Sequence, residues 1–552
     1  MVLSPETLSH LVPENEEAQL EQVPEGVRAL QTEVRVLRVQ SSLLKSVPDW
    51  VGELKCLTTL DVNGLSAHSG WDNSSMTALP ESIGNLETLK NLILVGLQGL
   101  RALPQSVGKL SSLQTFKIDQ CGVTAMPASF VRMTALTSLH IAKCSELEEL
   151  PADIGRLSVL KELMISSNPQ VQELPTSITS LGALQHFTLH EMASVATLVD
   201  FKNLSALATL TISACSSLTR LPEGIGELTN LKELNVTNLG ALQELPASAR
   251  VWIGLAQLEV LQLGASARLN LSMLPRMVAG AWALKHLHLH RLPQLQELPA
   301  VTESLTLLER LIITDCRKLI QLPGSVFWGL QALQELTLRL EALKELPDMG
   351  RLSALRRLEL SCSRVAQLPG SIRHLTGLQQ LSIDSCTFRD FPDIQVLTNL
   401  RTLELVMTKY AADCKVFRSL SRSLPCLRRL HKLSLRMDVV ETLDYGSRED
   451  SFHGQMRTGI SDEDVLAIGR SLRAWPLPLL LDITDSPYTP GLRLHQQKQA
   501  LGLPDPAREI PDEFMVNLEG SSQRYLHMGG CLYMTFCVLL IAYCVHRVCL
   551  YM

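Results

Sequence analysis

The stretch LPEGIGELTNLKELNVTNLGALQE, residues 221 to 244, sets the pattern of the chain, because the same frame returns as LPADIGRLSVLKELMISSNPQVQE from residue 150. Leu-Pro and related pairs mark the units, most of them 22 to 24 residues apart; the prolines are Pro80, Pro104, Pro127, Pro151, Pro175, Pro222, Pro246, Pro275, Pro299, Pro323, Pro347, Pro369 and Pro392. A chain of 552 residues is too long for one compact core. The fixed period therefore predicts an elongated array of one repeated unit.

Each unit carries the pattern L-x-x-L-x-L, which at this period is typical of leucine-rich repeats. On a short strand the leucines turn to one side and the residues between them to the other, so one strand cannot bury its apolar side alone. Stacking of neighbouring units is therefore required. We count 17 such strand cores, which begin at Val34, Leu57, Leu89, Leu113, Leu136, Leu160, Leu184, Leu207, Leu231, Leu258, Leu284, Leu308, Leu333, Leu355, Leu378, Leu400 and Leu430.

The stacked strands predict an α/β solenoid, a leucine-rich-repeat horseshoe with a parallel concave β-sheet and short helical or irregular convex segments. At about 4.8 Å per strand, the sheet would extend roughly 80 Å. The pattern LPxSIGxL would return the chain along the convex side. Its Pro favours extended backbone, and its Ser or Asp is expected to cap a short helical turn.

A column of turn residues is expected eight positions after the start of each strand core, where such repeats usually carry Asn or Cys. This structural turn ladder comprises Cys121, Cys144, Asn168, Cys215, Cys316 and Cys386. A side chain buried there would bond to the backbone of neighbouring turns, so these residues are predicted to be structural. The alternative is redox sensing, through neighbours such as Cys121 and Cys144.

The motif LPxSIGxLxxLxxLxIxxCxxLxxLP resembles the leucine-rich regions of plant disease-resistance receptors and of plant intracellular Ras-group-related leucine-rich proteins. LPESIGNLETLKNLIL at residue 79 and LHIAKCSELEELPADIGRL at residue 139 carry the likeness, which covers roughly residues 24 to 440. The resemblance implies recognition of protein partners in intracellular signalling or immunity. No G-x-x-x-x-G-K-[ST] loop is present, so the nucleotide-binding domain of those receptors has no counterpart in this sequence.

Histidines alternate with leucines in LKHLHLHRL, residues 284 to 292, and recur on an earlier strand; those at outward positions are His186, His190, His286, His288 and His290. Side chains two residues apart on a strand are separated by about 7 Å, so three from a single strand cannot close one tetrahedral zinc site. The neighbouring outward residues, Gln262 and Ile312, add no carboxylate or thiolate. We therefore interpret the stretch as recognition surface, with pH-tuned binding as an alternative, and expect no metal or cofactor.

Arginines occupy the outward positions of the later strands, namely Arg291, Arg310, Arg339, Arg356, Arg357, Arg401 and Arg436. Residues 401 to 437 hold nine Lys or Arg against Glu404 and Asp413, although the whole chain has a net charge of −6. This asymmetry predicts an anionic partner, such as an acidic or phosphorylated protein surface or lipid headgroups. The alternative is a solvated face partly paired with acids, which are Glu335, Glu359 and Asp384. No nucleic acid is expected, because aromatic residues are not interleaved with the basic ones.

The chain is predicted to contain five segments. They are an acidic N-terminal extension at 1–22, the solenoid at 23–440, a C-terminal cap of a helix and a strand at 441–485, a linker at 486–528 and a hydrophobic segment at 529–552. The sequence GGCLYMTFCVLLIAYCV, residues 529 to 545, approaches the length of a membrane span and makes a candidate tail anchor. The alternatives are a terminal helix packed on the array or a gene-model artefact.

The first 27 residues contain no Lys or Arg and have no signal-peptide pattern, which predicts a cytoplasmic protein with reduced thiols, or one held on the cytosolic face of a membrane by the C-terminal segment. No G-x-S-x-G, H-E-x-x-H, kinase or C-x-D signature appears. We therefore predict a non-catalytic protein-recognition scaffold, whose partner binds the concave face. The alternatives are a membrane-tethered adaptor and, more remotely, an enzyme with an undetected C-terminal activity.

Overall fold

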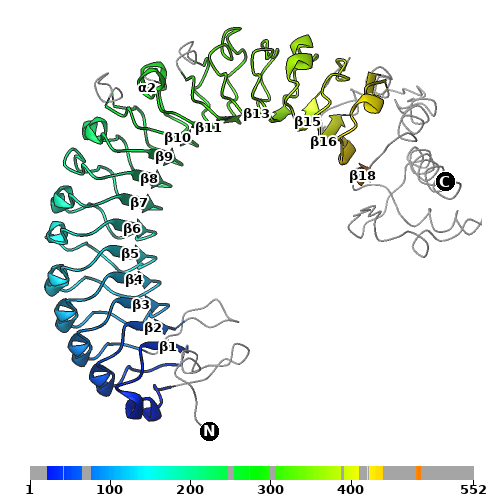
Figure 1. Ribbon diagram of the computed structural model, residues 1–552. Helices are drawn as coiled ribbons and strands as arrows, with labels where there is room; N and C mark the ends of the chain where they lie inside the picture. The colour runs from blue at the N-terminus through cyan, green and yellow to red at the C-terminus, as the bar shows by residue number, and fades with distance from the viewer. Residues whose placement is uncertain are drawn as a thin grey trace, which may run out of the picture. The chain divides into compact units, whose positions relative to one another are not determined.

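The computed structural model describes residues 21–41, 43–64, 76–246, 254–272, 274–298, 305–386, 391–408, 419–420, 422–438 and 480–485. The chain divides into two compact units, Met1–Leu284 (unit 1) and Lys285–Met552 (unit 2). Each unit repeats one motif, a short strand followed by a return segment (Figure 1). Residues 1–20 of the extension predicted at 1–22 lie outside the described residues, as do the helix expected near residue 461 and the segments 486–528 and 529–552.

In unit 1 the described strands are parallel, and each pairs with the next along the chain. Their register places buried residues opposite one another, as Leu92 faces Leu60 on one side and Phe116 on the other. The strands are β1 Val36–Gln40, β2 Thr59–Asn63, β3 Asn91–Val95, β4 Thr115–Asp119, β5 Ser138–Ala142, β6 Glu162–Ser166, β7 His186–His190, β8 Thr209–Ser213, β9 Glu233–Thr237 and β10 Val260–Gly264.

In unit 2 the described strands follow the same parallel order. They are β11 His286–His290, β12 Arg310–Thr314, β13 Glu335–Arg339, β14 Arg357–Ser361, β15 Gln380–Cys386, β16 Thr402–Thr408, β17 Lys432–Asp438 and β18 Leu480–Asp485. The strand predicted within residues 441–485 is thus present as β18, which adds to the sheet with Leu481 opposite Leu433.

Each of the 17 predicted strand cores is a strand that begins two residues after the predicted first position, as β4 begins at Thr115 after Leu113. The reason is burial. The apolar residues of the pattern are buried. In the repeat of β4 they are Leu113, Phe116 and Ile118, each with an exposed fraction of 0%. The leucine-rich-repeat solenoid predicted from the spacing is therefore the fold of both units.

The return segments of unit 1 lie opposite the strands, on the convex side of the unit (Figure 1). Most contain a 3-10 helix: η2 Glu25–Leu30, η3 Asp49–Glu53, η4 Glu81–Asn85, η5 Gln105–Lys109, η6 Ala128–Arg132, η7 Ile154–Arg156, η8 Thr176–Ser180 and η9 Glu223–Glu227, and the last described one is the α-helix α2 Leu274–Gly280. In unit 2 the return segments include η11 Gly370–His374 and η13 Leu424–Cys426.

The role predicted for Ser in these segments is wrong. The residue that precedes the helix is the Pro, in extended conformation at Pro127 (φ −65°, ψ 146°), and no side chain caps the helix there. The serine instead joins neighbouring repeats, because the Ser129 hydroxyl donates to the Gln105 carbonyl at 2.6 Å and the Ser177 hydroxyl to the Ala152 carbonyl at 2.5 Å. The serine of the recurring motif thus holds neighbouring repeats together and does not cap the helix.

A column of residues with positive φ follows the strands from β3 to β12. It consists of Gly96 and nine non-glycine residues: Gln120, Lys143, Ser167, Glu191, Ala214, Asn238, Ala265, Arg291 and Asp315. Within a unit each such residue extends the sheet by one more backbone bond, as Lys143 N–H donates to the Ser166 carbonyl at 2.9 Å. The left-handed conformation then turns the next side chain into the interior.

Among the described residues, no helix is long and apolar enough to cross a membrane.

Candidate functional site

The first, third and fifth residues of each five-residue strand lie on the outward side of the sheet, and the fifth is buried in β5, β6, β8, β9 and β10. In β4 these residues are half-buried, while Phe116 and Ile118 between them are fully buried. β7 follows the same alternation, with His186 exposed and His190 half-buried. Hydrogen bonds to both neighbouring strands fix the spacing of these outward side chains. Each five-residue strand thus presents two or three accessible side chains, and we call this surface of each unit its strand face.

In unit 1 the predicted histidines lie on the strand face. His190 Nδ1 lies 2.7 Å from Ser213 Oγ on β8, and its Nε2 lies 3.5 Å from Glu191. A hydrogen bond from Ser167, followed in importance by the charge of His190, lowers the pKa of Glu191. This arrangement holds the imidazole of His190 in place, whereas His186 stays exposed.

In unit 2 the three histidines of β11 also lie on the strand face, with Leu287 and Leu289 buried between them. The rings of His288 and His290 are 4.9 Å apart. Burial, ahead of the charge of His290, lowers the pKa of His288, and burial, ahead of Arg291, lowers that of His290. On β12 their register neighbours are Arg310, Ile312 and Thr314.

The arrangement of these histidines offers no evident metal centre, because Ile312 and Thr314 supply no strong metal ligand. In the described part of the chain, no group of three His, Cys, Asp or Glu side chains is placed to hold a metal ion.

The arginines in β12, β13 and β14 are paired with acids of neighbouring strands. Arg310 on β12 and Arg357 on β14 both contact Glu335 on β13, at 2.5 and 2.9 Å. Arg339 contacts Glu359 through two guanidinium nitrogens. The pairing with Glu335 and Glu359 that we gave as the alternative is therefore present.

Three of the predicted arginines do not lie at outward positions of strands. Arg291 follows β11 at a left-handed turn position (φ 48°) and lies 3.6 Å from Asp315. Arg356 and Arg401 each precede a strand by one residue, because the regular alternation begins only at the third residue of L-x-x-L-x-L. Arg436 lies in β17, in register with Val406 of β16.

The residues predicted to form the turn ladder, where their side chains are described, directly follow the turns at the ends of the strands. Cys121, Cys144, Asn168, Cys215 and Cys316 are all buried. Asn168 donates to the Ile141 and Ser166 carbonyls and accepts from the Cys144 N–H at 2.9 Å, so it joins two turns. The thiols bond backbone carbonyls, as Cys316 does with Thr314 at 3.4 Å.

Burial makes the ladder thiols poor nucleophiles. Desolvation is the largest effect, and it raises the pKa of Cys121 to about 12 and those of Cys144 and Cys316 to about 11. The described cysteines are free thiols. These values favour a structural role over redox sensing, because the thiolate is the reactive form.

The ladder departs from the predicted spacing in two places. Cys386 ends β15 rather than lying in a turn, since this strand is two residues longer and its pairing with β16 shifts between Ile383 and Cys386. Cys362, which the prediction missed, is a ladder residue: it is fully buried and donates to the Leu338 carbonyl at 3.7 Å. It lies seven rather than eight positions after its core begins at Leu355, because no positive-φ residue precedes it.

Comparison with known proteins agrees with this repeat chemistry. Residues 177–342 match the family model for leucine-rich repeats of plant disease resistance proteins of the RPS2-like group. The repeats of this chain resemble those of plant disease resistance proteins. The Arabidopsis thaliana protein At4g19050, whose name assigns it to disease resistance, is 31% identical over 172 residues, which are 31% of this chain and 14% of that protein. The disease resistance protein RPS6 of Arabidopsis thaliana is 27% identical over 232 residues, 36% of this chain and 20% of that protein.

Among solved structures, a leucine-rich-repeat protein of Leptospira interrogans is similar with 24% identity and a TM-score of 0.45, and the match covers 68% of this chain and 97% of that one. The chain matches less than a quarter of the length of the two Arabidopsis proteins. The similarity therefore concerns the repeats.

Proposed function

We propose that this protein is a non-catalytic recognition scaffold that binds protein partners on its strand face. The observation that carries the proposal is the regular exposure of two or three side chains per five-residue strand, held in register by backbone bonds to both neighbours. Such a surface is preorganised, so binding orders few groups. The burial of the leucines leaves the outward residues free to vary without cost to the core.

The proposed setting is intracellular signalling or defence-type recognition in the cytoplasm. The match of residues 177–342 to repeats of plant disease resistance proteins supports this setting. We further propose that the partner of unit 2 is acidic or phosphorylated, which the arginines in and beside β12 to β16 support.

The experiment places two long side chains on the strand face of unit 1. Thr188 and Thr211 lie opposite each other on β7 and β8 and are half-buried. The variant Thr188→Arg, Thr211→Arg blocks the face without touching the core. The matched control is Thr176→Arg, Thr229→Arg, at exposed positions of the return segments.

Full-length chains carrying an affinity tag are crosslinked in extracts of the native cell type, and attached proteins are identified with their crosslinked residues. We expect crosslinks to residues of the strand face, and loss of those partners in the face variant but not in the control. Partners that crosslink only to return segments, or that survive in the face variant, would contradict the proposal.

A further inference from the structure

The arginines in β12 to β14 differ from those that directly precede β14 and β16 in whether an acid neutralises them, and this difference indicates where an anionic partner binds; the inference rests on the proposed function. Arg310, Arg339 and Arg357, in the strands, are each paired with a glutamate. Arg356 and Arg401 have no ionic partner among the described residues, and both are exposed. The positive charge that a partner could bind therefore lies on residues that directly precede the strands and not on these three arginines within them.

Arg356 and Arg401 belong to one continuous row, which we call the basic edge. It consists of the residues that directly precede β13 to β17: Gln334, Arg356, Gln379, Arg401 and His431. Each N–H of the row donates to the carbonyl of the preceding member, at 2.8 Å from Arg356 to Gln334, 2.8 Å from Gln379 to Arg356, 2.7 Å from Arg401 to Gln379 and 2.8 Å from His431 to Arg401. The order and the spacing of these side chains are therefore fixed by the sheet.

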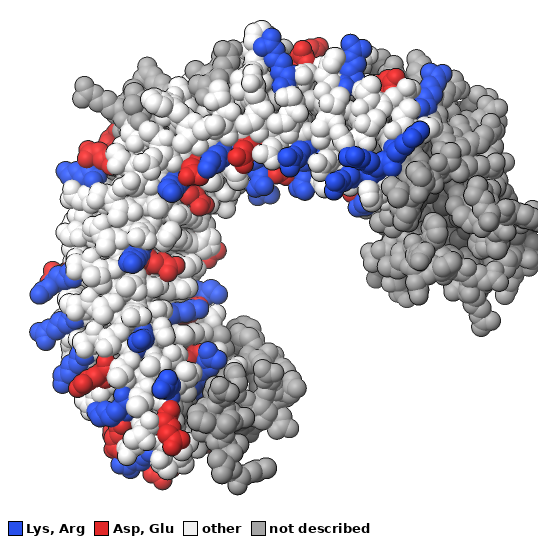
Figure 2. Space-filling model, viewed as in Figure 1, with Lys and Arg blue, Asp and Glu red and all other residues white. Residues whose placement is uncertain are grey.

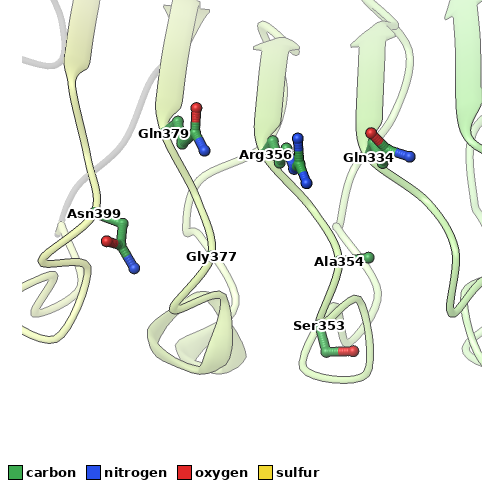
Figure 3. A pocket seen from close by; sticks show the side chains of 7 residues that line it. All are labelled: Gln334, Ser353, Ala354, Arg356, Gly377, Gln379 and Asn399. Atoms are coloured by element: carbon green, nitrogen blue, oxygen red, sulfur yellow. The ribbon is translucent and has the colours of Figure 1, made fainter.

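A shallow hollow of about 390 Å³ opens along the basic edge. Figure 3 shows Gln334, Arg356 and Gln379 side by side where three neighbouring strands begin, with Asn399, Gly377, Ala354 and Ser353 completing the wall. The side chain of Asn399 is already engaged, since it donates to the Thr376 carbonyl at 2.9 Å and accepts from Arg429 at 2.8 Å. The wall carries no acid, so the hollow presents a guanidinium between two amide side chains.

Two acids near the Arg356–Arg401 part of the basic edge are occupied elsewhere, whereas Glu309, which precedes β12, lies next to Gln334 at the far end of the row. Glu404 on β16 binds Lys432 at 2.7 Å, and Asp393 accepts from the Gln395 N–H at 2.9 Å and from Ser423 at 3.3 Å. In Figure 2 the Lys and Arg side chains gather toward the C-terminal end of the described part of unit 2. The hollow, lined by residues between Gln334 and Asn399, belongs to the same unit as this positive charge.

The spacing of the two unpaired arginines selects the ligand. They are separated by two strand steps, about 10 Å, with Gln379 between them, so each guanidinium can bind an anionic group of its own. A peptide in the polyproline II conformation advances about 3.1 Å per residue with three residues per turn, so side chains three residues apart point to the same side and lie about 9 Å apart. A carboxylate accepts two parallel hydrogen bonds from one guanidinium.

We propose that the basic edge binds an acidic segment of a partner protein in the polyproline II conformation, with carboxylates three residues apart on Arg356 and Arg401. Gln334 and Gln379 then donate to carbonyls of the peptide backbone beside these contacts. The segment runs across the strands, along the row of residues that precede them.

The test uses the full-length protein and fluorescein-labelled peptides in an anisotropy titration at low salt. The probe GGEGGEGG carries glutamates three residues apart, and GGEEGGGG carries the same charge on adjacent residues. We expect the spaced probe to bind more tightly than the adjacent one, and the variant Arg356→Gln, Arg401→Gln to weaken its binding on the order of tenfold. The control Arg132→Gln, Arg220→Gln removes the same charge from exposed positions of unit 1.

Equal binding of the spaced probe by the wild type and the edge variant would overturn the inference, as would an equal loss in the control. Two further probes, a phosphoserine peptide and phosphatidylserine vesicles, are titrated in parallel. Preference for either over the spaced peptide, lost in the edge variant, would overturn the choice of carboxylates. A thermal unfolding temperature equal to that of the wild type is the control that the Arg356→Gln, Arg401→Gln variant is folded. If the spaced peptide does not bind the basic edge but the Thr188→Arg, Thr211→Arg variant still loses its crosslinked partners, this inference is wrong and the proposed function stands.

Discussion

At the scale of single residues, the ladder cysteines show how burial decides chemistry. With the pKa of Cys121 at about 12 and that of Cys144 at about 11, almost no thiolate exists at pH 8. We expect iodoacetamide to leave both thiols unmodified in the folded protein while the exposed Cys426 reacts. Peptide mass spectrometry after a timed reaction measures this directly. Unfolding in guanidinium should make all three react equally, and modification of Cys121 as fast as Cys426 in the native protein would contradict a structural role.

The histidines of β11 make stability depend on pH. Burial lowers the pKa of His288 and His290 below the ordinary value of 6.5, so the unfolded chain binds more protons than the folded one as pH falls. Their contribution is therefore fully present above about pH 6.5 and is lost as pH falls through that value toward the lower folded pKa. We expect the variant His288→Gln, His290→Gln to flatten the decline in stability between pH 7 and pH 5.

Urea unfolding at several pH values, followed by circular dichroism, measures this change. The control His374→Gln replaces an imidazole of η11 in the return segment. It should keep the wild-type slope, and an unchanged slope in the β11 variant would show that these imidazoles do not carry the effect.

At the scale of one element, the return segment depends on a glycine. A Cβ on Gly108 would lie 2.2 Å from the Ser129 carbonyl oxygen of the next repeat, so the two segments stack only because this position lacks a side chain. We expect Gly108→Ala to destabilise the protein by about 2 kcal/mol through overpacking. Gly182→Ala is the control, because nothing lies within 4 Å of a Cβ there. Denaturant unfolding compares the two, and equal stabilities would mean that the segment shifts without cost.

The sequence predicted the elements because one physical demand sets them all. A leucine at a buried position must repeat with the strand, so Leu113, Leu136 and the other core starts located every strand from β1 to β17 within two residues. The same reasoning located Cys121 and Asn168 in the turn ladder. It failed for Cys362, because no positive-φ residue precedes it. The distance from the start of the strand core to the turn residue is therefore one residue shorter in this repeat, while the leucine pattern is the same.

The candidate site was less predictable from sequence for a different reason. Whether an arginine is neutralised depends on its neighbour across the sheet, some 20 residues away in the chain, as Arg339 and Glu359 show. The sequence placed Arg356 and Arg357 together as outward residues, whereas only Arg357 reaches Glu335. Serine hydroxyls that bridge repeats, such as Ser129, were taken for helix caps because the pattern specifies residue types and not partners.

At the scale of the whole molecule, stability should be transmitted only between neighbours. Each described strand bonds to the strands beside it, so destabilisation of one repeat should spread to the next and fade beyond. Leu210 in β8 is fully buried, and Leu210→Ala leaves a cavity that costs at least about 2 kcal/mol. We expect amide hydrogen exchange in β7, β8 and β9 to accelerate about thirtyfold, since 1.4 kcal/mol corresponds to tenfold.

Exchange in β2 and β3 should stay at the wild-type rate, and Leu60→Ala, which removes an equally buried leucine from β2, should give the reverse pattern. Mass spectrometry of peptic fragments resolves the two regions. Acceleration of equal size in β2 and β8 for both variants would mean that unit 1 unfolds as one cooperative body. In that case neighbour-to-neighbour stacking would not be its governing interaction, and a partner bound on one part of the strand face would stabilise every repeat of the unit alike.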